Sequence, residues 1–244
     1  MLSPDDLTPE QVAIIDRLYE NNCLLIAQAG AGKTVCSQTA AQELIADGVL
    51  KRVLIVAPLR VCELTWATEY KKWEYLCKPG LAFGAGADER RAVIEGDNPI
   101  VVINFENLPW LFKTWGRDHG FDGLIIDESS KLQAAGGETF KALRGGRGER
   151  IKDFKWRVCL SATPVHEGGT QLYTQMMVVD GGATLGTSKD KFLRKYFMQA
   201  DYKGYKWEYQ ETGLKRLLDD IEPWVMLADT VEYEKTLPDL SLIH

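Results

Sequence analysis

Residues 27–34 of the chain read Ala27-Gln28-Ala29-Gly30-Ala31-Gly32-Lys33-Thr34. They follow an apolar run at 23–26 and precede a helix-compatible segment at 35–46. A strand, a glycine-rich turn, a Lys-Thr pair and a helix, in this order, are typical of a phosphate-binding P-loop. Gly30 and Gly32 favour such a loop because a backbone without a Cβ can curl around a phosphate.

The N–H groups of this turn and of the following helix would point at the anion. Lys33 would reach the β- and γ-phosphates of ATP as a catalytic cation, and the Thr34 hydroxyl would hold Mg²⁺. The strict pattern has a glycine where this chain has Ala27, and the alternative is a glycine-rich turn with an incidental Lys-Thr pair. The residues that we predict to bind the nucleotide here are Ala29, Gly30, Ala31, Gly32, Lys33 and Thr34.

The composition is that of an ordinary soluble domain, with 45% hydrophobic and 26% charged residues among 244. The net charge of −6 excludes a general polyanion binder, so any contact with nucleic acid must use a local patch. Neither a membrane-length apolar run nor a signal peptide is visible. The five cysteines form no C-x-x-C pair. We therefore expect reduced thiols, a cytoplasmic location and no membrane partner.

Apolar strand-like runs alternate with helix-compatible stretches along the first two thirds of the chain. This alternation predicts an α/β fold, with a mostly parallel sheet covered by helices on both faces. Ligands of such sheets bind at the carboxyl ends of the strands, where all the candidate residues fall. The predicted strands are at 23–26, 52–58, 99–104, 121–128 and 156–164.

Local signals also predict where helices begin and end. Thr8 and Gln11 form a capping box at the start of the first helix, and Gly48 suits the end of the helix after the P-loop. We expect one helix over 61–76, whose aromatic residues belong to the core, and a helix over 106–115 that Pro109 interrupts.

Asp127 and Glu128 end a strand of the form Leu-Ile-Ile-Asp, which is typical of a Walker B strand. Asp127 would hold Mg²⁺, and Glu128 would orient and deprotonate the attacking water. Adjacent carboxylates at a strand end can do both jobs beside a γ-phosphate. The alternative is a solvated Asp-Glu pair at the end of a strand.

The order of three motifs, at 27–34, 127–130 and 161–163, resembles motifs I, II and III of superfamily 2 helicases. That superfamily commonly has A-x-x-G-x-G-K-T, so Ala27 fits it. Segments at 57–60, 102–108 and 192–197 resemble the Swi/Snf-like branch, and Ser129-Ser130 resembles phage-encoded members. The resemblance implies a RecA-like ATP-binding lobe over 1–165 and a helical extension over 166–244 that ends at the inter-lobe linker.

The resemblance also implies roles for individual residues. Gln11 falls where the family reads adenine, which is as good an explanation for it as the capping box. Arg60 and Asn104 fall where the family contacts the nucleic-acid backbone, whereas Ser161 and Thr163 would couple hydrolysis to lobe movement. For the last two, the alternative is an ordinary turn at the end of a strand.

Motifs IV, V and VI, with the arginine fingers of a second lobe, are absent from these 244 residues. Because an arginine finger is worth on the order of 10³–10⁵ in rate in related phosphoryl transfer, we expect weak ATPase activity from this chain alone. The resemblance therefore implies two partners, DNA, most often duplex, and a second RecA-like lobe in cis or in trans. A phage protein in the host cytoplasm would fit this pattern.

Two basic segments, at 141–157 and 189–207, are candidates for DNA contact, although a run of charges is more often a solvated face. The first function hypothesis is thus the motor lobe of a DNA-dependent ATPase. The second is a non-enzymatic module that binds nucleotide, DNA or a partner without turnover. The third, a small-molecule kinase, is disfavoured by the Ser161-Ala162-Thr163 motif.

Overall fold

A computed structural model describes residues 1–134, 137–146, 148–163, 171–200 and 207–228. Its centre is a seven-stranded sheet in the order β3-β4-β2-β5-β6-β1-β9, in which every neighbouring pair is parallel. The predicted parallel α/β sheet is thereby confirmed. The strands are β1 Cys23–Ile26, β2 Val53–Ala57, β3 Gly80–Leu81, β4 Ile100–Asn104, β5 Gly123–Ile126, β6 Trp156–Ser161 and β9 Val225–Leu227.

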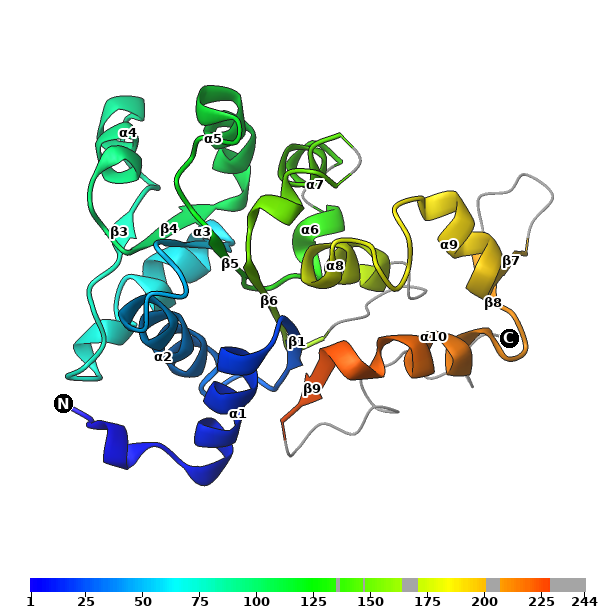
Figure 1. Ribbon diagram of the computed structural model, residues 1–244, viewed down its shortest axis with the longest axis horizontal. Coiled ribbons are helices and arrows are strands. Elements are labelled where there is room, and N and C mark those ends of the chain that lie inside the picture. The colour runs from blue at the N-terminus through cyan, green and yellow to red at the C-terminus, as the bar shows by residue number, and fades with distance from the viewer. Residues whose placement is uncertain (135–136, 147, 164–170, 201–206, 229–244) are drawn as a thin grey trace.

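Helices cover both faces of this sheet (Figure 1). One face packs against α1 and α2, and the other against the helices from α4 onward. The helices are α1 Pro9–Glu20, α2 Lys33–Ala46, α3 Leu59–Val61, α4 Ala87–Glu95, α5 Leu108–Trp115, α6 Lys131–Ala134, α7 Glu138–Arg144, α8 Gln171–Asp180, α9 Lys189–Tyr196 and α10 Gly213–Ile221.

The two faces carry separate apolar cores because successive side chains of a strand point to opposite sides. In β1, Leu24 and Ile26 belong to one core, whereas Cys23 and Leu25 belong to the other. The central strands are buried along their whole length, which explains their unbroken apolar runs.

Two predicted helix ends are confirmed. Thr8 Oγ1 accepts from the Gln11 N–H at 3.2 Å, and Gln11 Oε1 accepts from the Thr8 N–H at 3.0 Å, which closes the capping box of α1. After α2, Gly48 has a φ of +73°, and its N–H donates to the Ile45 carbonyl. The Val49 N–H donates to Leu44, so α2 ends in a Schellman motif.

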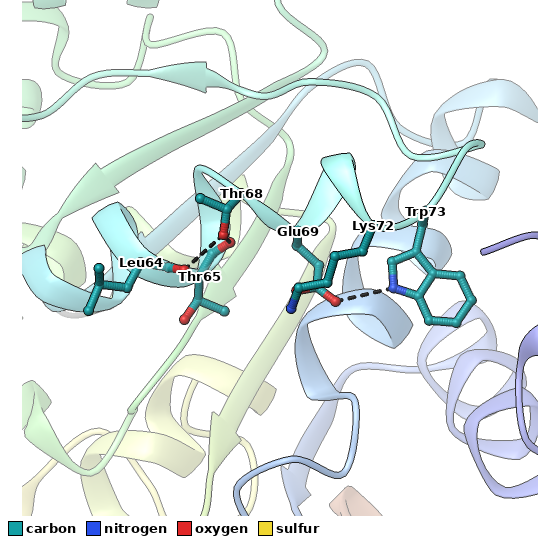
Figure 2. A network of polar contacts seen from close by, with 6 residues as sticks. All are labelled: Leu64, Thr65, Thr68, Glu69, Lys72 and Trp73. Atoms are coloured by element: carbon teal, nitrogen blue, oxygen red, sulfur yellow. Dashed lines mark hydrogen bonds and ion pairs between the residues drawn. The ribbon is translucent and has the colours of Figure 1, made fainter. Parts of the chain in front are cut away.

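The single helix expected over 61–76 is wrong. The chain instead forms the short α3, a π-helical turn at Cys62–Trp66 and a 3₁₀ turn at Glu69–Lys71. The Thr68 hydroxyl donates to the Leu64 carbonyl at 2.8 Å, as Figure 2 shows. Such side-chain bonds compete with a regular helix.

The interruption expected at Pro109 is also wrong. A 3₁₀ turn at Phe105–Asn107 leads directly into α5, which places Pro109 in the first turn of that helix. The missing N–H of a proline costs nothing at this position, because the first N–H groups of a helix have no partner inside it.

The described part of 166–244 contains α8, α9 and α10 and also three strands. Strands β7 Phe197–Gln199 and β8 Trp207–Tyr209 form an antiparallel hairpin beside α9 and α10 (Figure 1). Strand β9 returns to the main sheet and pairs with β1, where Met226 lies opposite Leu25. The described part of this region thus combines three helices with a two-stranded hairpin, and its last described strand joins the main sheet.

The five cysteines form no disulfide in the described part of the chain. The thiols of Cys23, Cys36, Cys62, Cys77 and Cys159 are all free. Burial raises the pKa of the Cys23 thiol to about 11 and that of the Cys62 thiol to about 12. Within the described ranges, we found no helix long and apolar enough to span a bilayer.

His119 is a buried histidine in the loop between α5 and β5, and it is packed among the rings of Phe112, Phe121 and Phe154. Its ring stacks on that of Phe154, with centroids 5.1 Å apart, and its Nδ1 accepts from the Phe121 N–H at 3.1 Å. Burial lowers the pKa of His119, and this effect is opposed in part by the nearby Asp153 carboxylate. The neutral imidazole is therefore a packing element, with no metal assigned to it.

This burial predicts a pH dependence of stability. The folded-state pKa of His119 lies below the value of about 6.5 for an unfolded chain, so the unfolded state binds more protons as the pH falls through that region. The stability that the neutral ring contributes is complete above about pH 6.5 and is lost at lower pH. In urea unfolding at pH 7 and pH 5, we expect His119→Phe to lose less stability than the wild type over this interval. Equal losses would contradict the assignment.

Candidate functional site

The candidate residues meet at one edge of the sheet because all seven strands point the same way. The P-loop follows β1, and Asp127 and Glu128 follow β5. Between these two strands lies β6, which ends at Ser161. The three motifs, which are far apart in the sequence, therefore lie in the loops after three adjacent strands, β1, β6 and β5.

Two glycines give the P-loop its shape. Gly30 has a φ of +87° and Gly32 a φ of +83°, in the left-handed region that other residues rarely adopt. A Cβ on Gly32 would also lie only 2.4 Å from Gln11 Nε2. Gly32 is the N-cap of α2 and has no side chain with which to cap it. The first N–H groups of this helix are therefore left for an anion.

Lys33 opens α2 and folds back over the loop. Its ammonium group donates to the Ala27 carbonyl at 2.7 Å and to the Gln28 carbonyl at 2.9 Å. Burial lowers the pKa of Lys33, whereas the negative charges of Asp127 and Glu128 raise it. The cation thus lies between the loop carbonyls and the two carboxylates, from which it can turn to a phosphate.

Asp127 is buried, with only 6% of its surface exposed, and two donors hold its carboxylate. Trp66 Nε1 donates to Oδ2 at 2.9 Å, and the backbone N–H of Glu128 donates to Oδ1 at 2.8 Å. Burial raises the pKa of Asp127, and these two hydrogen bonds and the Lys33 charge oppose the rise. The carboxylate is therefore oriented and polarised before any ligand arrives.

Glu128 has a φ of +51°, and no other described residue except glycine has a positive φ. Its half-buried side chain directly follows Asp127. The turn is fastened on its far side, where the Ser129 N–H donates to the Leu160 carbonyl at 2.9 Å and the Ser129 hydroxyl donates to Gln175 Oε1 at 2.9 Å. Strained backbone at such a position is typical of functional sites.

Ser161 joins the P-loop to the end of β6. Its carbonyl accepts from the Ala27 N–H at 3.1 Å, and its hydroxyl accepts from the Thr163 N–H at 3.2 Å. Ser161 is buried, whereas Thr163 is exposed. The two coupling candidates are therefore in contact with each other and, through Ser161, with the nucleotide loop.

Gln11 serves its capping role and also lies beside the P-loop. Its Oε1 is engaged with the Thr8 N–H, which leaves the amide nitrogen next to Gly32. Both explanations for Gln11 are thus geometrically compatible. Adenine recognition by this amide stays a prediction.

The two nucleic-acid candidates occupy different environments at the same edge. Arg60 is exposed on α3, directly after β2. Asn104 is buried, and its amide donates to Glu106 Oε2 and accepts from Asn107 Nδ2. Neither lies among the P-loop contacts, and their roles stay predictions.

The basic segments prove partly structural. Arg157 is used internally, since its guanidinium donates to the carbonyls of Ile151, Phe154 and Val179. Arg150 donates to the Ala142 carbonyl, and Lys195 pairs with Asp220 at 2.8 Å. Of the two segments, positions 147 and 201–206 lie outside the described residues.

Trp66 is the residue of this site that sequence reasoning missed. It was expected in the core, and its ring is indeed fully buried, but its N–H reaches a predicted metal ligand. Nothing in the sequence distinguishes it from Trp73, whose indole donates to Glu69 Oε1 at 3.2 Å (Figure 2). The two tryptophans differ in their hydrogen-bond partners because the backbone directs each ring to a different carboxylate.

The residues present fit a nucleoside triphosphate with Mg²⁺. A loop bent by two left-handed glycines, an open helix N-terminus and an ammonium group suit phosphates. The Thr34 hydroxyl and the Asp127 carboxylate are the hard oxygen donors that Mg²⁺ prefers, and this ion is usually bound by one or two carboxylates together with substrate phosphates. Within the described ranges, no group of three or more His, Cys, Asp or Glu side chains is placed to hold a metal.

Comparison with known proteins agrees with this geometry. The family model for DEAD/DEAH box helicase matches residues 8–168. Protein p41 of Acyrthosiphon pisum secondary endosymbiont phage 1 is 30% identical over an alignment of 220 residues, and the match covers 86% of this chain and 47% of p41.

The fold of this chain also resembles those of solved structures. The SWI2/SNF2 ATPase core of Sulfolobus solfataricus, in complex with dsDNA, superposes with a TM-score of 0.71 at 20% identity, over 96% of this chain and 46% of that one. The UvsW helicase of bacteriophage T4 superposes with a TM-score of 0.51 at 14% identity, over 69% of this chain and 57% of UvsW. The chain therefore spans about half the length of p41 and of the archaeal ATPase core.

The left-handed backbone of Glu128 predicts an unusual order of stabilities. A residue with a Cβ pays roughly 1–2 kcal/mol for this conformation, which glycine adopts freely. We expect Glu128→Gly to be more stable than Glu128→Ala by about 1 kcal/mol in urea unfolding, although glycine normally destabilises. If Glu128→Ala were the more stable variant, the strain would be absent.

Proposed function

Because the chain belongs to the DEAD/DEAH box helicase family, we propose that it is the ATP-binding motor lobe of a superfamily 2 DNA translocase. The observation that carries this proposal is the convergence of one cation with two carboxylates. Lys33, from the loop after β1, lies within electrostatic reach of Asp127 and Glu128, from the loop after β5. Binding a triphosphate and activating a water require these three groups at one place.

Each of these residues has a specific task in the proposed reaction. Lys33 exchanges its bonds to the Ala27 and Gln28 carbonyls for bonds to phosphate oxygens. Asp127 and the Thr34 hydroxyl would hold Mg²⁺, which would supply neutralisation of negative charge on the phosphates. Glu128 orients the attacking water and accepts its proton on a carboxylate oxygen.

The proposed coupling path runs through the end of β6. Ser161 contacts the P-loop through Ala27 and contacts Thr163 through its hydroxyl. This path would carry a change at the nucleotide loop to Thr163, which is exposed. Gln11, beside Gly32, would read the adenine ring.

The proposed partners are duplex DNA and a second RecA-like lobe. The DNA-bound archaeal ATPase core and the chain's coverage of about half of its relatives support this proposal. Residues 1–165 would form the nucleotide lobe, and 166–244 its extension toward the second lobe, with β9 tied back to β1. Arg60 and Asn104 would face the nucleic-acid backbone. Similarity to a phage protein supports action in the cytoplasm of a host cell.

The first test concerns the P-loop lysine. Lys33→Ala removes the cation that would meet the β- and γ-phosphates, so we expect ATP binding measured by calorimetry to fall below detection. Lys51→Ala is a suitable control, because Lys51 precedes β2 and lies at the opposite edge of the sheet. Unchanged ATP affinity in Lys33→Ala would reject the P-loop assignment.

The second test concerns the base. Glu128→Gln keeps the size of the side chain but cannot accept the proton of the attacking water. We expect nearly unchanged ATP affinity with turnover lowered by about 10²-fold or more, in an ATPase assay that adds a candidate second lobe and duplex DNA. Equal turnover of the two proteins would reject the role of Glu128.

The same assay separates the remaining hypotheses. Strong DNA-stimulated turnover by the wild-type chain alone would contradict the need for a second lobe. ATP binding without turnover in every combination would favour the non-enzymatic binding module.

A further inference from the structure

Trp66 connects the segment after β2 to the carboxylate after β5. Its indole is fully buried, and its N–H donates to Asp127 Oδ2 at 2.9 Å. We propose that Trp66 is a positioning residue that orients Asp127 for Mg²⁺ in the nucleotide complex. This inference rests on the proposed function, which makes Asp127 the metal ligand.

The two hydrogen bonds of Asp127 leave the carboxylate free to bind a metal. Oδ1 accepts the Glu128 N–H, and Oδ2 accepts the Trp66 N–H. Each carboxylate oxygen has about two lone-pair sites, so one on each oxygen stays open. Donors on both oxygens fix the plane of the group. Such partners of a metal ligand commonly contribute 10–100-fold to metal affinity or activity.

The π-helical turn Cys62–Trp66 aims the indole. The Ala67 N–H donates to the Cys62 carbonyl at 3.0 Å, so this turn holds one residue more than an α-helical turn. An extra residue rotates the side chains after it by about 100° relative to an unbroken helix. Because β2 and β5 are neighbours in the sheet, the segment that carries Trp66 and the loop that carries Asp127 follow adjacent strands.

The sheet itself holds this turn in place. The Cys62 thiol lies against the carbonyls of Ala57 and Ile103, at the ends of β2 and β4, at 3.5 and 3.6 Å. On the other side, the Asp127 N–H donates to the Val56 carbonyl at 2.8 Å. Asp127 and the turn that carries Trp66 are thus both bonded to the end of β2.

Trp73 provides a matched comparison within the same segment. It is also buried, and its N–H also donates to a carboxylate, that of Glu69, which pairs with Lys72 at 2.7 Å (Figure 2). All three members of this network lie within five residues of one another. Trp73→Phe therefore removes an indole N–H from a buried carboxylate without affecting Asp127.

The test is a calorimetric titration of ATP into wild type, Trp66→Phe and Trp73→Phe, each with Mg²⁺ and with EDTA. Phenylalanine keeps an aromatic ring but has no donor. For Trp66→Phe we expect ATP affinity in EDTA to stay within about twofold of wild type, and the affinity gained with Mg²⁺ to fall by about 10-fold or more. In Trp73→Phe, Mg²⁺ should raise the ATP affinity as much as it does in wild type.

The positioning role of Trp66 and the metal-binding role of Asp127 can be rejected separately. If Mg²⁺ raises the ATP affinity of Trp66→Phe as much as that of wild type, but does not raise that of Asp127→Asn, the positioning role is overturned. Asp127 then stays assigned as the metal ligand. If Mg²⁺ raises the ATP affinity of Asp127→Asn as much as that of wild type, the assignment of Asp127 as a metal ligand is overturned, and the inference with it. Thermal melts verify folding. If Trp66→Phe does not fold, replacing Trp66 by benzothienylalanine keeps the shape of the ring and removes only the N–H, and the same outcomes apply.

Discussion

Two backbone carbonyls at the end of β6 hold the site together. The Ser161 carbonyl accepts from Ala27 at the start of the P-loop, and the Leu160 carbonyl accepts from Ser129 just after the two carboxylates. Because β6 lies between β1 and β5, these bonds continue the sheet for one more residue on each side. The phosphate loop and the carboxylates are therefore held at one strand spacing on either side of β6, of about 4.8 Å.

This arrangement combines buried charge with a strained backbone, and both cost free energy. Lys33 is desolvated, Asp127 is almost fully buried, and Glu128 has a left-handed backbone. Preorganised dipoles offset these costs, since the carbonyls of the P-loop hold the ammonium group and two N–H donors hold the Asp127 carboxylate. The Asp127 carboxylate is therefore oriented before a ligand binds, whereas Lys33 has to leave its carbonyl partners to reach a phosphate.

Features with a local physical cause were predicted correctly from the sequence. The capping box of Thr8 and Gln11 and the end of α2 at Gly48 depend only on neighbouring residues. The alternation of apolar runs correctly indicated a parallel sheet, because strands buried on both faces must be apolar throughout. The prediction was wrong for the helix over 61–76, where a π-helical turn and a side-chain bond from Thr68 replace a regular helix, and for the interruption at Pro109, which lies in the first turn of α5. The pairing of β9 with β1 joins segments from opposite ends of the described chain, which no local pattern indicates.

The sequence by itself determined the fold class and the candidate nucleotide residues, because the P-loop and the Walker B strand are short motifs whose shape follows from residue type and spacing. The tertiary structure alone decided the strand order, which makes these motifs neighbours. It also decided which of two similar tryptophans reaches Asp127. The physical reason is that the π-helical turn at Cys62–Trp66 and the pairing of β2 with β5 set the direction of the Trp66 indole. Both depend on packing against residues far away in the chain.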